Sequence, residues 1–255
     1  MKTKILLILF ALSISIAGTS QNVYTISSGE MIFSQSQTTF TPEFLAQYPD
    51  AMISADNVRF TMFFHLGQYV HYDFNNSFGI FSGLALRNIG MITDEKLPQT
   101  VSTNGSAVNY QDYKIIRREY TVGVPLALKL GAFNKHFYFF GGGEYELSLC
   151  FKEKFWSGGF DRSGSKTKNT KWFSNQSPTF IPSVFAGVQF PHGLNLKFKY
   201  YLNNFLNSNY KLSSNDQNGN VYNISDLRRY EDSQVMYFTL SWQFDPAEII
   251  SEKIR

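Results

Sequence analysis

Long stretches of alternating apolar and polar residues are the feature that most constrains the fold of this chain. In residues 59–74, large apolar side chains recur at nearly every second position from Phe60 to Phe74, with polar residues such as Arg59 and His71 between them. Successive side chains of a strand point to opposite faces, whereas helices repeat apolar residues at three and four positions. The pattern therefore predicts a strand with one apolar and one polar face.

Seven stretches of the chain share this alternation, and an eighth is weaker. The seven are residues 59–74, 78–87, 117–130, 136–152, 183–190, 194–203 and 236–244, and the weaker one spans about 23–33. The eighth has an imperfect pattern and is accepted because of the connections described next.

The connections between these stretches are short and long in turn. The short ones, 75–77, 134–135 and 191–193, contain the Asn, Gly and Pro residues that hairpin turns use. The long connections are at about 42–57, 93–112, 156–177 and 207–232. Outer-membrane barrels have short periplasmic turns and long outer loops. Eight strands place both chain ends in the periplasm, whereas seven would leave the N-terminus outside. The sequence thus predicts an all-β, eight-stranded antiparallel up-and-down transmembrane β-barrel with long extracellular loops.

The N-terminal residues have the composition of a secretory signal. Lys2 and Lys4 precede an apolar run at 5–17, and small residues follow at 18–20. The run is too short to span a bilayer comfortably as a helix, which needs about 20 residues. We expect a signal peptide at 1–20, a barrel at 21–244 and a short periplasmic tail at 245–255.

The two faces of the predicted strands differ in a way that orients the barrel. The apolar faces carry large side chains with aromatics near the strand ends, as membrane interfaces require. The polar faces carry small residues and charges of both signs, which suit a narrow interior. A soluble exported sandwich or barrel, with apolar residues inside, is the alternative. The predicted lumenal charge network comprises Arg59, Arg87, Arg117, Glu119, Lys129, Glu144 and Glu146, with Asp73, Lys197 and Lys199 on the same faces.

Composition excludes several classes of function. A formal net charge of +3 is too small to indicate a nucleic-acid partner. The single cysteine, Cys150, excludes an intrachain disulfide framework and has no metal-ligand spacing. Eight strands leave an interior just wide enough for side chains, which argues against a general porin. We predict no cofactor and no metal.

A hydrolase constellation is the alternative that the titratable residues raise. His65 and His71 share a face with Asp73, and Ser148 or Ser183 would be the nucleophile. No G-x-S-x-G motif accompanies them. We therefore predict no catalytic residues, and the chain is expected not to be an enzyme. A barrel enzyme acting on lipid or peptide and a narrow conduit for small solutes remain the alternatives.

The third long loop contains basic and aromatic residues that form a candidate contact surface. These are Trp156, Lys166, Lys168, Lys171 and Trp172. Such residues near the outer leaflet suit lipopolysaccharide phosphates or an anionic glycan. A solvated loop with no partner is the alternative interpretation.

Four segments of the chain resemble a known family. They are 83–90 (GLALRNIG), 120–125 (YTVGVP), 139–144 (FFGGGE) and 201–206 (YLNNFL). They look like Bacteroidetes-type outer-membrane β-barrel proteins of the PorT-like group, and the likeness extends over nearly the whole mature chain. The resemblance implies an outer-membrane location and eight strands, and some members are linked to secretion or gliding machinery. No catalytic residues carry over.

These observations together predict a non-enzymatic outer-membrane barrel with a structural or partner-binding role at the surface. Its expected partners are outer-membrane lipid and a protein or glycan bound by the extracellular loops. We expect the outer-membrane barrel assembly machinery to insert it.

Overall fold

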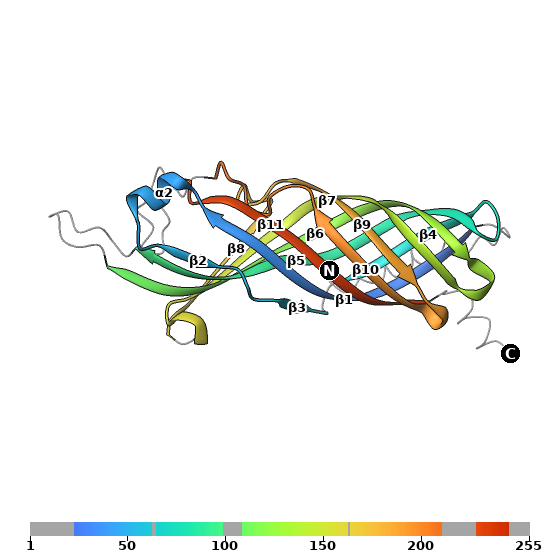
Figure 1. The fold of residues 1–255 in the computed structure, drawn as a ribbon, viewed down its shortest axis with the longest axis horizontal. Helices are drawn as coiled ribbons and strands as arrows, with labels where there is room; N and C mark the ends of the chain where they lie inside the picture. Colours follow the sequence, from blue (N-terminus) through green and yellow to red (C-terminus); the bar gives the residue numbers. More distant parts are fainter. Residues whose placement is uncertain (1–22, 63–64, 99–108, 163, 211–227, 245–255) are drawn as a thin grey trace, which may run out of the picture.

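A closed ring of eight antiparallel strands forms the body of the protein (Figure 1). The computed structural model describes residues 23–62, 65–98, 109–162, 164–210 and 228–244. Around the ring, the strands are β1 (Val23–Phe40), β4 (Leu66–Asp73), β5 (Phe78–Pro98), β6 (Tyr110–Ala132), β7 (Phe137–Trp156), β9 (Phe180–Gln189), β10 (Leu194–Tyr201) and β11 (Tyr230–Phe244). The ring closes because β11 pairs with β1, from Phe244 opposite Ser27 to Tyr230 opposite Phe40. The predicted eight-stranded barrel is confirmed. The predicted signal peptide and C-terminal tail lie outside the described residues.

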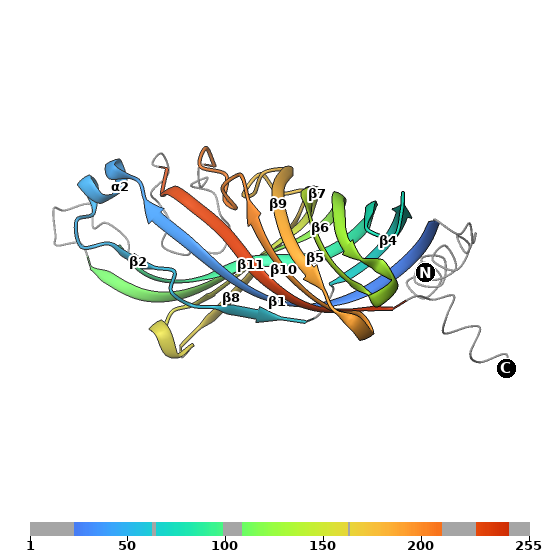
Figure 2. The same ribbon diagram turned by 45° about the vertical axis from the view of Figure 1, so that its right-hand side comes forward.

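The two ends of the barrel differ in the length of their connections (Figures 1 and 2). One end carries the turn after β4 and the short helical turns η1 (Phe133–Lys135) and η3 (Pro191–Gly193). The other end carries α2 (Pro42–Gln47) and the short strands β2 (Met52–Ser54) and β8 (Lys166–Trp172), with η2 (Gly159–Asp161) before β8. None of the described helices is long and apolar enough to span a bilayer.

Several strands are longer, and their loops shorter, than alternation predicted. β1 continues to Phe40 rather than to about 33, and β5 and β6 extend into the region 93–112, which was expected to be a loop. Residues 88–93 of β5 are buried whichever way they point, so apolar and polar residues do not alternate there. β8 lies within the expected loop 156–177 and pairs with β7.

Large apolar side chains cover the outside of the ring. Leu126 and Leu128 on β6 are 64% and 54% exposed, while Ala127 between them is 2% exposed and faces inward. The same outward exposure recurs on strands around the ring, at Phe33, Leu66, Val70, Leu84, Phe139, Val184, Leu196 and Phe238. We call this surface the apolar belt. Its sense is opposite to that of a soluble barrel with an apolar interior and a polar exterior.

A short helix closes the long-loop end of the barrel. Thr41 caps α2 by accepting a hydrogen bond from the Phe44 backbone N–H (3.2 Å), and Pro42 suits the first helical turn. The helix buries Phe44 completely, in a cluster that includes Tyr48 and Leu97. Apolar side chains therefore fill this end of the lumen.

In one part of the wall, side-chain hydrogen bonds replace the backbone hydrogen bonds that would pair two neighbouring strands. The first predicted strand is broken into β3 (Arg59–Thr61) and β4, and β5 pairs with β4 only as far as Leu86. Beyond it, the Arg59 guanidinium donates to the Asn88 carbonyl oxygen (3.0 Å), and the Asn88 N–H donates to His65 Nδ1 (3.2 Å). These contacts satisfy backbone groups that a neighbouring strand would otherwise pair. We call this region the seam.

Gly142 lies where the neighbouring strand leaves no room for a side chain. A Cβ at Gly142 would lie 2.0 Å from the Leu126 carbonyl oxygen, whereas at Gly141 the nearest atom is 3.5 Å away. We expect Gly142→Ala to lower the free energy of unfolding by roughly 1–3 kcal/mol, because the backbone of β6 must move. Gly141→Ala is the matched control and is expected to change it by less than about 0.5 kcal/mol. Urea titration of the barrel in detergent micelles measures both, and equal stabilities would contradict the expectation.

Candidate functional site

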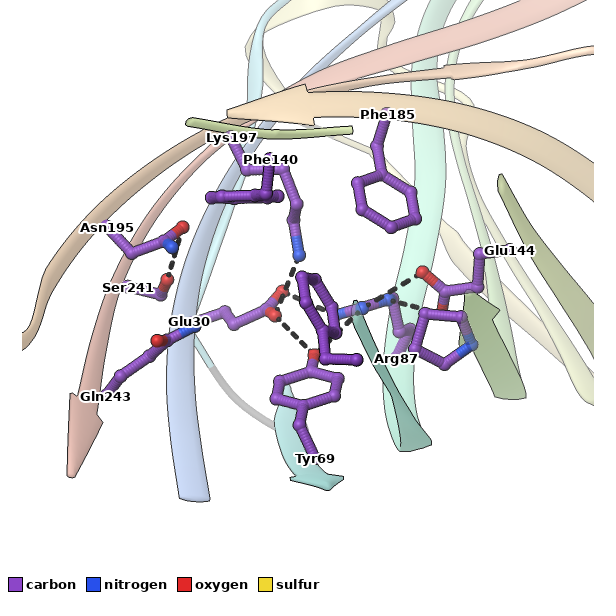
Figure 3. Close-up of a pocket in the computed structure, with 12 residues that line it drawn as sticks. Glu30, Tyr69, Arg87, Phe140, Glu144, Phe185, Asn195, Lys197, Ser241 and Gln243 are labelled. Atoms are coloured by element: carbon purple, nitrogen blue, oxygen red, sulfur yellow. Dashed lines mark hydrogen bonds and ion pairs between the residues drawn. The ribbon is translucent and has the colours of Figure 1, made fainter. Parts of the chain in front are cut away.

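Six ionisable side chains meet in the middle of the lumen. They come from four strands and are Glu30, Arg87, Glu144, Glu146, Lys197 and Lys199. Arg87 forms an ion pair with Glu30 and donates to both carboxylate oxygens of Glu144 at 3.2 Å. Figure 3 shows Arg87 between the two carboxylates, with Lys197 approaching Glu30 from another strand. We call these six residues the central charge cluster.

The central charge cluster is balanced and almost completely hydrogen-bonded. Its three carboxylates face three cations, and Lys199 binds both Glu144 (2.7 Å) and Glu146. Buried tyrosines add bonds: Tyr69 donates to Glu30 (3.2 Å) and Tyr201 to Glu146 (2.9 Å). Burying charges is costly unless each is paired and hydrogen-bonded. This cluster satisfies that requirement without a bound ion.

A small cavity lies beside the central charge cluster. It has a volume of about 10 Å³ and is lined by Glu30, Arg87, Phe140 and Phe185, among others. A space of this size holds at most about one water molecule. An aromatic cluster containing Phe81, Phe140 and Phe185 fills the lumen on the short-turn side. The site is therefore a filled cross-section of the barrel and not a binding pocket for a solute.

A second charged cluster lies nearer the long-loop end, around Arg117. Its guanidinium donates to Glu153 (2.7 Å) and to Glu95 (2.9 Å), and it also bonds Tyr230. Burial alone would raise the pKa of Glu95, but Arg117 and Arg229 hold it below the ordinary value. Burial raises the pKa of Glu153 above its ordinary value, although Arg117 opposes this. The two carboxyls beside one arginine thus differ in how readily they take a proton.

A single ion pair lies at the short-turn end of the lumen. Lys129 is fully buried and forms an ion pair with Asp73. The Lys129 Nζ also donates to the Tyr24 hydroxyl (2.6 Å) and lies 4.4 Å from the centre of the Phe133 ring. These contacts hold the Lys129 ammonium group in place at this end of the lumen.

The structure divides the predicted lumenal network into separate groups. Arg87, Glu144 and Glu146 come together, whereas Arg117 and Lys129 belong to clusters on either side of them. The remaining two predicted members form no ion pair with any other described residue: Glu119 accepts from Ser177 (2.8 Å), and Arg59 lies in the seam.

Three acidic members of these clusters, Glu30, Glu95 and Glu153, are absent from the network that the sequence predicts. Glu30 is on the weakly alternating first strand, and Glu95 is in a region expected to be a loop. The predicted inward faces contain more cations than carboxylates, with Arg87, Lys197 and Lys199 among the cations. Because buried cations need carboxylate partners, this excess was the signal that further inward carboxylates exist.

The residues considered for a hydrolase do not form a catalytic arrangement. His65 binds Thr61 (3.3 Å) and the Asn88 backbone, and His71 stacks between Tyr24 and Phe81. The Ser148 hydroxyl donates to the Pro178 carbonyl (2.7 Å), and that of Ser183 to the Glu144 carbonyl (3.1 Å). Within the described part of the chain, no group of three or more His, Cys, Asp or Glu residues is placed to hold a metal ion.

The predicted contact residues lie on a ribbon that extends beyond the barrel wall. β7 pairs with β9 as far as Leu147 and then, after a bulge, with β8 from Cys150 to Trp156. The register places Lys166 opposite Trp156 and Lys168 opposite Lys154, so these residues share one face with Trp172. Lys171 lies opposite Phe151 and belongs to the other face. The structure therefore brings four of the five predicted residues together.

The chain is similar to several solved structures, among them two of Ail and one of OprG. No protein-family model and no curated protein matches the sequence. Ail, the attachment invasion locus protein of Yersinia pestis, aligns over 87% of this chain and 99% of its own, at 14% identity and a TM-score of 0.32. Ail in complex with the heparin analogue sucrose octasulfate gives 15% identity, the same coverage and a TM-score of 0.33. The outer membrane protein OprG from Pseudomonas aeruginosa aligns over 88% of this chain and 96% of its own, at 12% identity and a TM-score of 0.34. The fold assignment rests on the strand pairing itself.

Arg87 is the cation whose removal most disturbs the central charge cluster. Arg87→Met leaves Glu30 and Glu144 with fewer cations in a buried site, and we expect the free energy of unfolding to fall by about 3–5 kcal/mol. Arg118→Met is the control, because Arg118 lies on the outward face of the next strand and forms no ion pair with a described residue. Urea titration in micelles compares them; equal losses would contradict a special role for the cluster.

The two carboxyls beside Arg117 are expected to respond differently to neutralisation. Folding favours the charged form of Glu95 and disfavours that of Glu153, so Glu95→Gln is expected to destabilise the barrel more than Glu153→Gln. The lowered pKa of Glu95 contributes stability that is present above its ordinary pKa of 4.5 and is lost as the pH falls below it. In unfolding measured from pH 7 to 3, the stability difference between wild type and Glu95→Gln is expected to narrow towards the acid end. A constant difference across this range would contradict the assignment.

Proposed function

We propose that this protein is a non-enzymatic outer-membrane β-barrel of the PorT-like kind that anchors a partner-binding surface outside the cell. The observation that carries the proposal is the combination of an exposed apolar belt with a filled, charge-balanced lumen. An apolar surface of this extent is stable when it contacts lipid. Because the interior is filled, the long-loop end is the place where a partner would bind.

Two properties of the wall support a membrane location. The ring closes on itself, so no strand edge would have to face hydrocarbon, which cannot hydrogen-bond backbone groups. Exposed aromatic side chains lie near the short-turn end, where a membrane–water interface would be. These aromatics are Phe74, Phe137, Trp242 and Phe244. The predicted signal peptide is consistent with export.

The filled lumen and the contacts of the histidines support a role other than transport or catalysis. Apolar clusters lie on both sides of the central charge cluster, and α2 covers the long-loop end. A solute would have to break buried ion pairs to pass. His65 and His71 are used in packing and in the seam, without a serine or carboxylate partner among the described residues. We infer a structural anchor that works through its surface.

The apolar belt gives a direct test of the membrane location. Leu126 is 64% exposed in the middle of the belt, and we expect Leu126→Arg to lower the stability of the inserted barrel by about 2–4 kcal/mol. Met52→Arg is the matched control, since Met52 is 65% exposed but lies on β2 at the long-loop end. Loss of heat-modifiable migration in cold detergent gels reports the loss of the folded barrel. Equal tolerance of both changes would show that the belt does not face lipid.

Planar-bilayer recording tests whether the lumen conducts. We expect the purified protein, inserted in a bilayer, to show no steady ionic conductance, because apolar clusters pack the described lumen on both sides of the central charge cluster. Gly142→Ala and wild type are expected to be equally silent. A steady conductance in the wild type would favour the solute-conduit alternative and contradict the anchor proposed here.

A further inference from the structure

Five basic residues gather on one outward face of the sheet that extends beyond the barrel. They are Arg118 on β6, Lys152 and Lys154 on β7, and Lys166 and Lys168 on β8. Arg118 lies directly opposite Lys152, and Lys154 directly opposite Lys168. Directly opposed residues of antiparallel strands share a face and lie about 4.5–5.5 Å apart at Cβ. We call these five residues the cationic face.

The cationic face is a continuation of the apolar belt. On β6, the outward positions that follow Arg118 are Tyr120, Val122, Val124 and Leu126. This row of side chains reaches the middle of the belt at Leu126. Trp172 and Phe173, at the end of β8 nearest the belt, are 69% and 66% exposed. Large exposed aromatics of this kind mark the boundary between hydrocarbon and headgroups. In the proposed membrane orientation, the side chains of the cationic face thus point away from the barrel axis, on the long-loop side of the belt.

The charges of the cationic face have no partners of opposite sign among the described residues. None of its five members forms an ion pair there, and the buried Arg118 Nε forms no hydrogen bond. The inward face of the same strands is different, since Arg117, next to Arg118, pairs with both Glu95 and Glu153. Like charges placed directly opposite each other destabilise a sheet. On the outward face, Asp94 is paired with Lys114, and the five members of the cationic face have no such compensation among the described residues.

The crowding of positive charge is visible in the properties of Lys154. Burial lowers the pKa of its ammonium group below the ordinary value, and Arg118, Lys166, Lys168 and Lys152 lower it further. Among the described residues, the favourable contacts of Lys152 and Lys166 are with aromatic rings. Lys152 lies 4.5 Å from the ring centre of Tyr120, and Lys166 lies 5.4 Å from that of Trp156. An anion on this face would relieve the repulsion.

We propose that the cationic face binds the phosphate groups of anionic glycolipid headgroups in the outer leaflet. This step rests on the outer-membrane location proposed above. Closely spaced lysine and arginine side chains suit phosphate oxygens, and the aromatic boundary places these side chains at headgroup depth. Because the cationic face points away from the barrel at the depth of the headgroups, the phosphates of neighbouring lipids are the nearest anions. This position favours a lipid over a soluble polyanion as the ligand.

The test measures lipid A binding to the whole barrel protein in phosphatidylcholine nanodiscs. Energy transfer from the protein's tryptophans to dansyl-labelled lipid A gives the affinity, with dephosphorylated lipid A as the comparison ligand. Lys152→Gln/Lys154→Gln/Lys168→Gln is expected to weaken binding of phosphorylated lipid A on the order of a hundredfold, at about fivefold per charge. Arg118→Gln alone is expected to weaken it about fivefold. Added salt is expected to weaken binding by the wild type.

A matched variant removes three lysines that lie elsewhere. Lys96→Gln/Lys135→Gln/Lys171→Gln has the same net charge as the triple variant of the cationic face, and it is expected to bind like the wild type. Lys171 lies on the opposite face of β8, and Lys135 at the short-turn end. Equal losses in the two triple variants would overturn the proposal, since any three charges would then be equivalent. Heat-modifiable migration shows that each variant is folded.

Three further results would overturn the proposal in distinguishable ways. Equal affinity for phosphorylated and dephosphorylated lipid A in an inserted wild-type barrel would remove the phosphate claim and leave the anchor function standing. Tight binding of a soluble sulfated polysaccharide, lost in the same triple variant and exceeding lipid A binding, would assign the face to a glycan. Wild-type protein that does not float with phosphatidylcholine vesicles would overturn the membrane location and this proposal together.

Discussion

The backbone ladder between β1 and β11 is the interaction on which the rest of the structure depends. Without it, the sheet would have two long edges and an open interior, whereas with it every strand of the ring has neighbours on both sides. Closing a sheet at eight strands also fixes the width of the interior, which is then just large enough for side chains. The outward surface of the wall can therefore be apolar, and the polar side chains of the wall are buried in the lumen.

That narrow interior explains why the charged residues of the lumen occur in balanced groups. A buried charge that loses its partner is strongly destabilising. Arg87, Arg117, Lys129 and Lys199 therefore lie against carboxylates, and Arg59 donates to the backbone and amide oxygens of Asn88. The groups alternate along the barrel with apolar and aromatic clusters, which separate one set of charges from the next. The polar face of the strands is thus a packed interior, although its composition resembles that of a channel lining.

Alternation in the sequence predicted the fold wherever one face of a strand meets the apolar belt and the other meets the lumen, as in 120–130 of β6. It was insufficient for residues 88–93, where both faces are covered, and for β8, which is polar on a ribbon that leaves the wall. The candidate site was predictable as a class of inward charges. Its actual pairs required the register between strands, because Glu30 and Lys197 are 167 positions apart and meet only in the closed ring.

The continuity of β6 and β7 from the apolar belt into the extension has a mechanical consequence. These strands are 23 and 20 residues long and pair with each other across the bulge, so a hydrogen-bonded sheet connects the described outer ribbon to the wall. A molecule held by that ribbon cannot swivel independently of the barrel, as it could on a flexible loop. Its attachment would therefore fix the direction in which the whole barrel faces about its own axis.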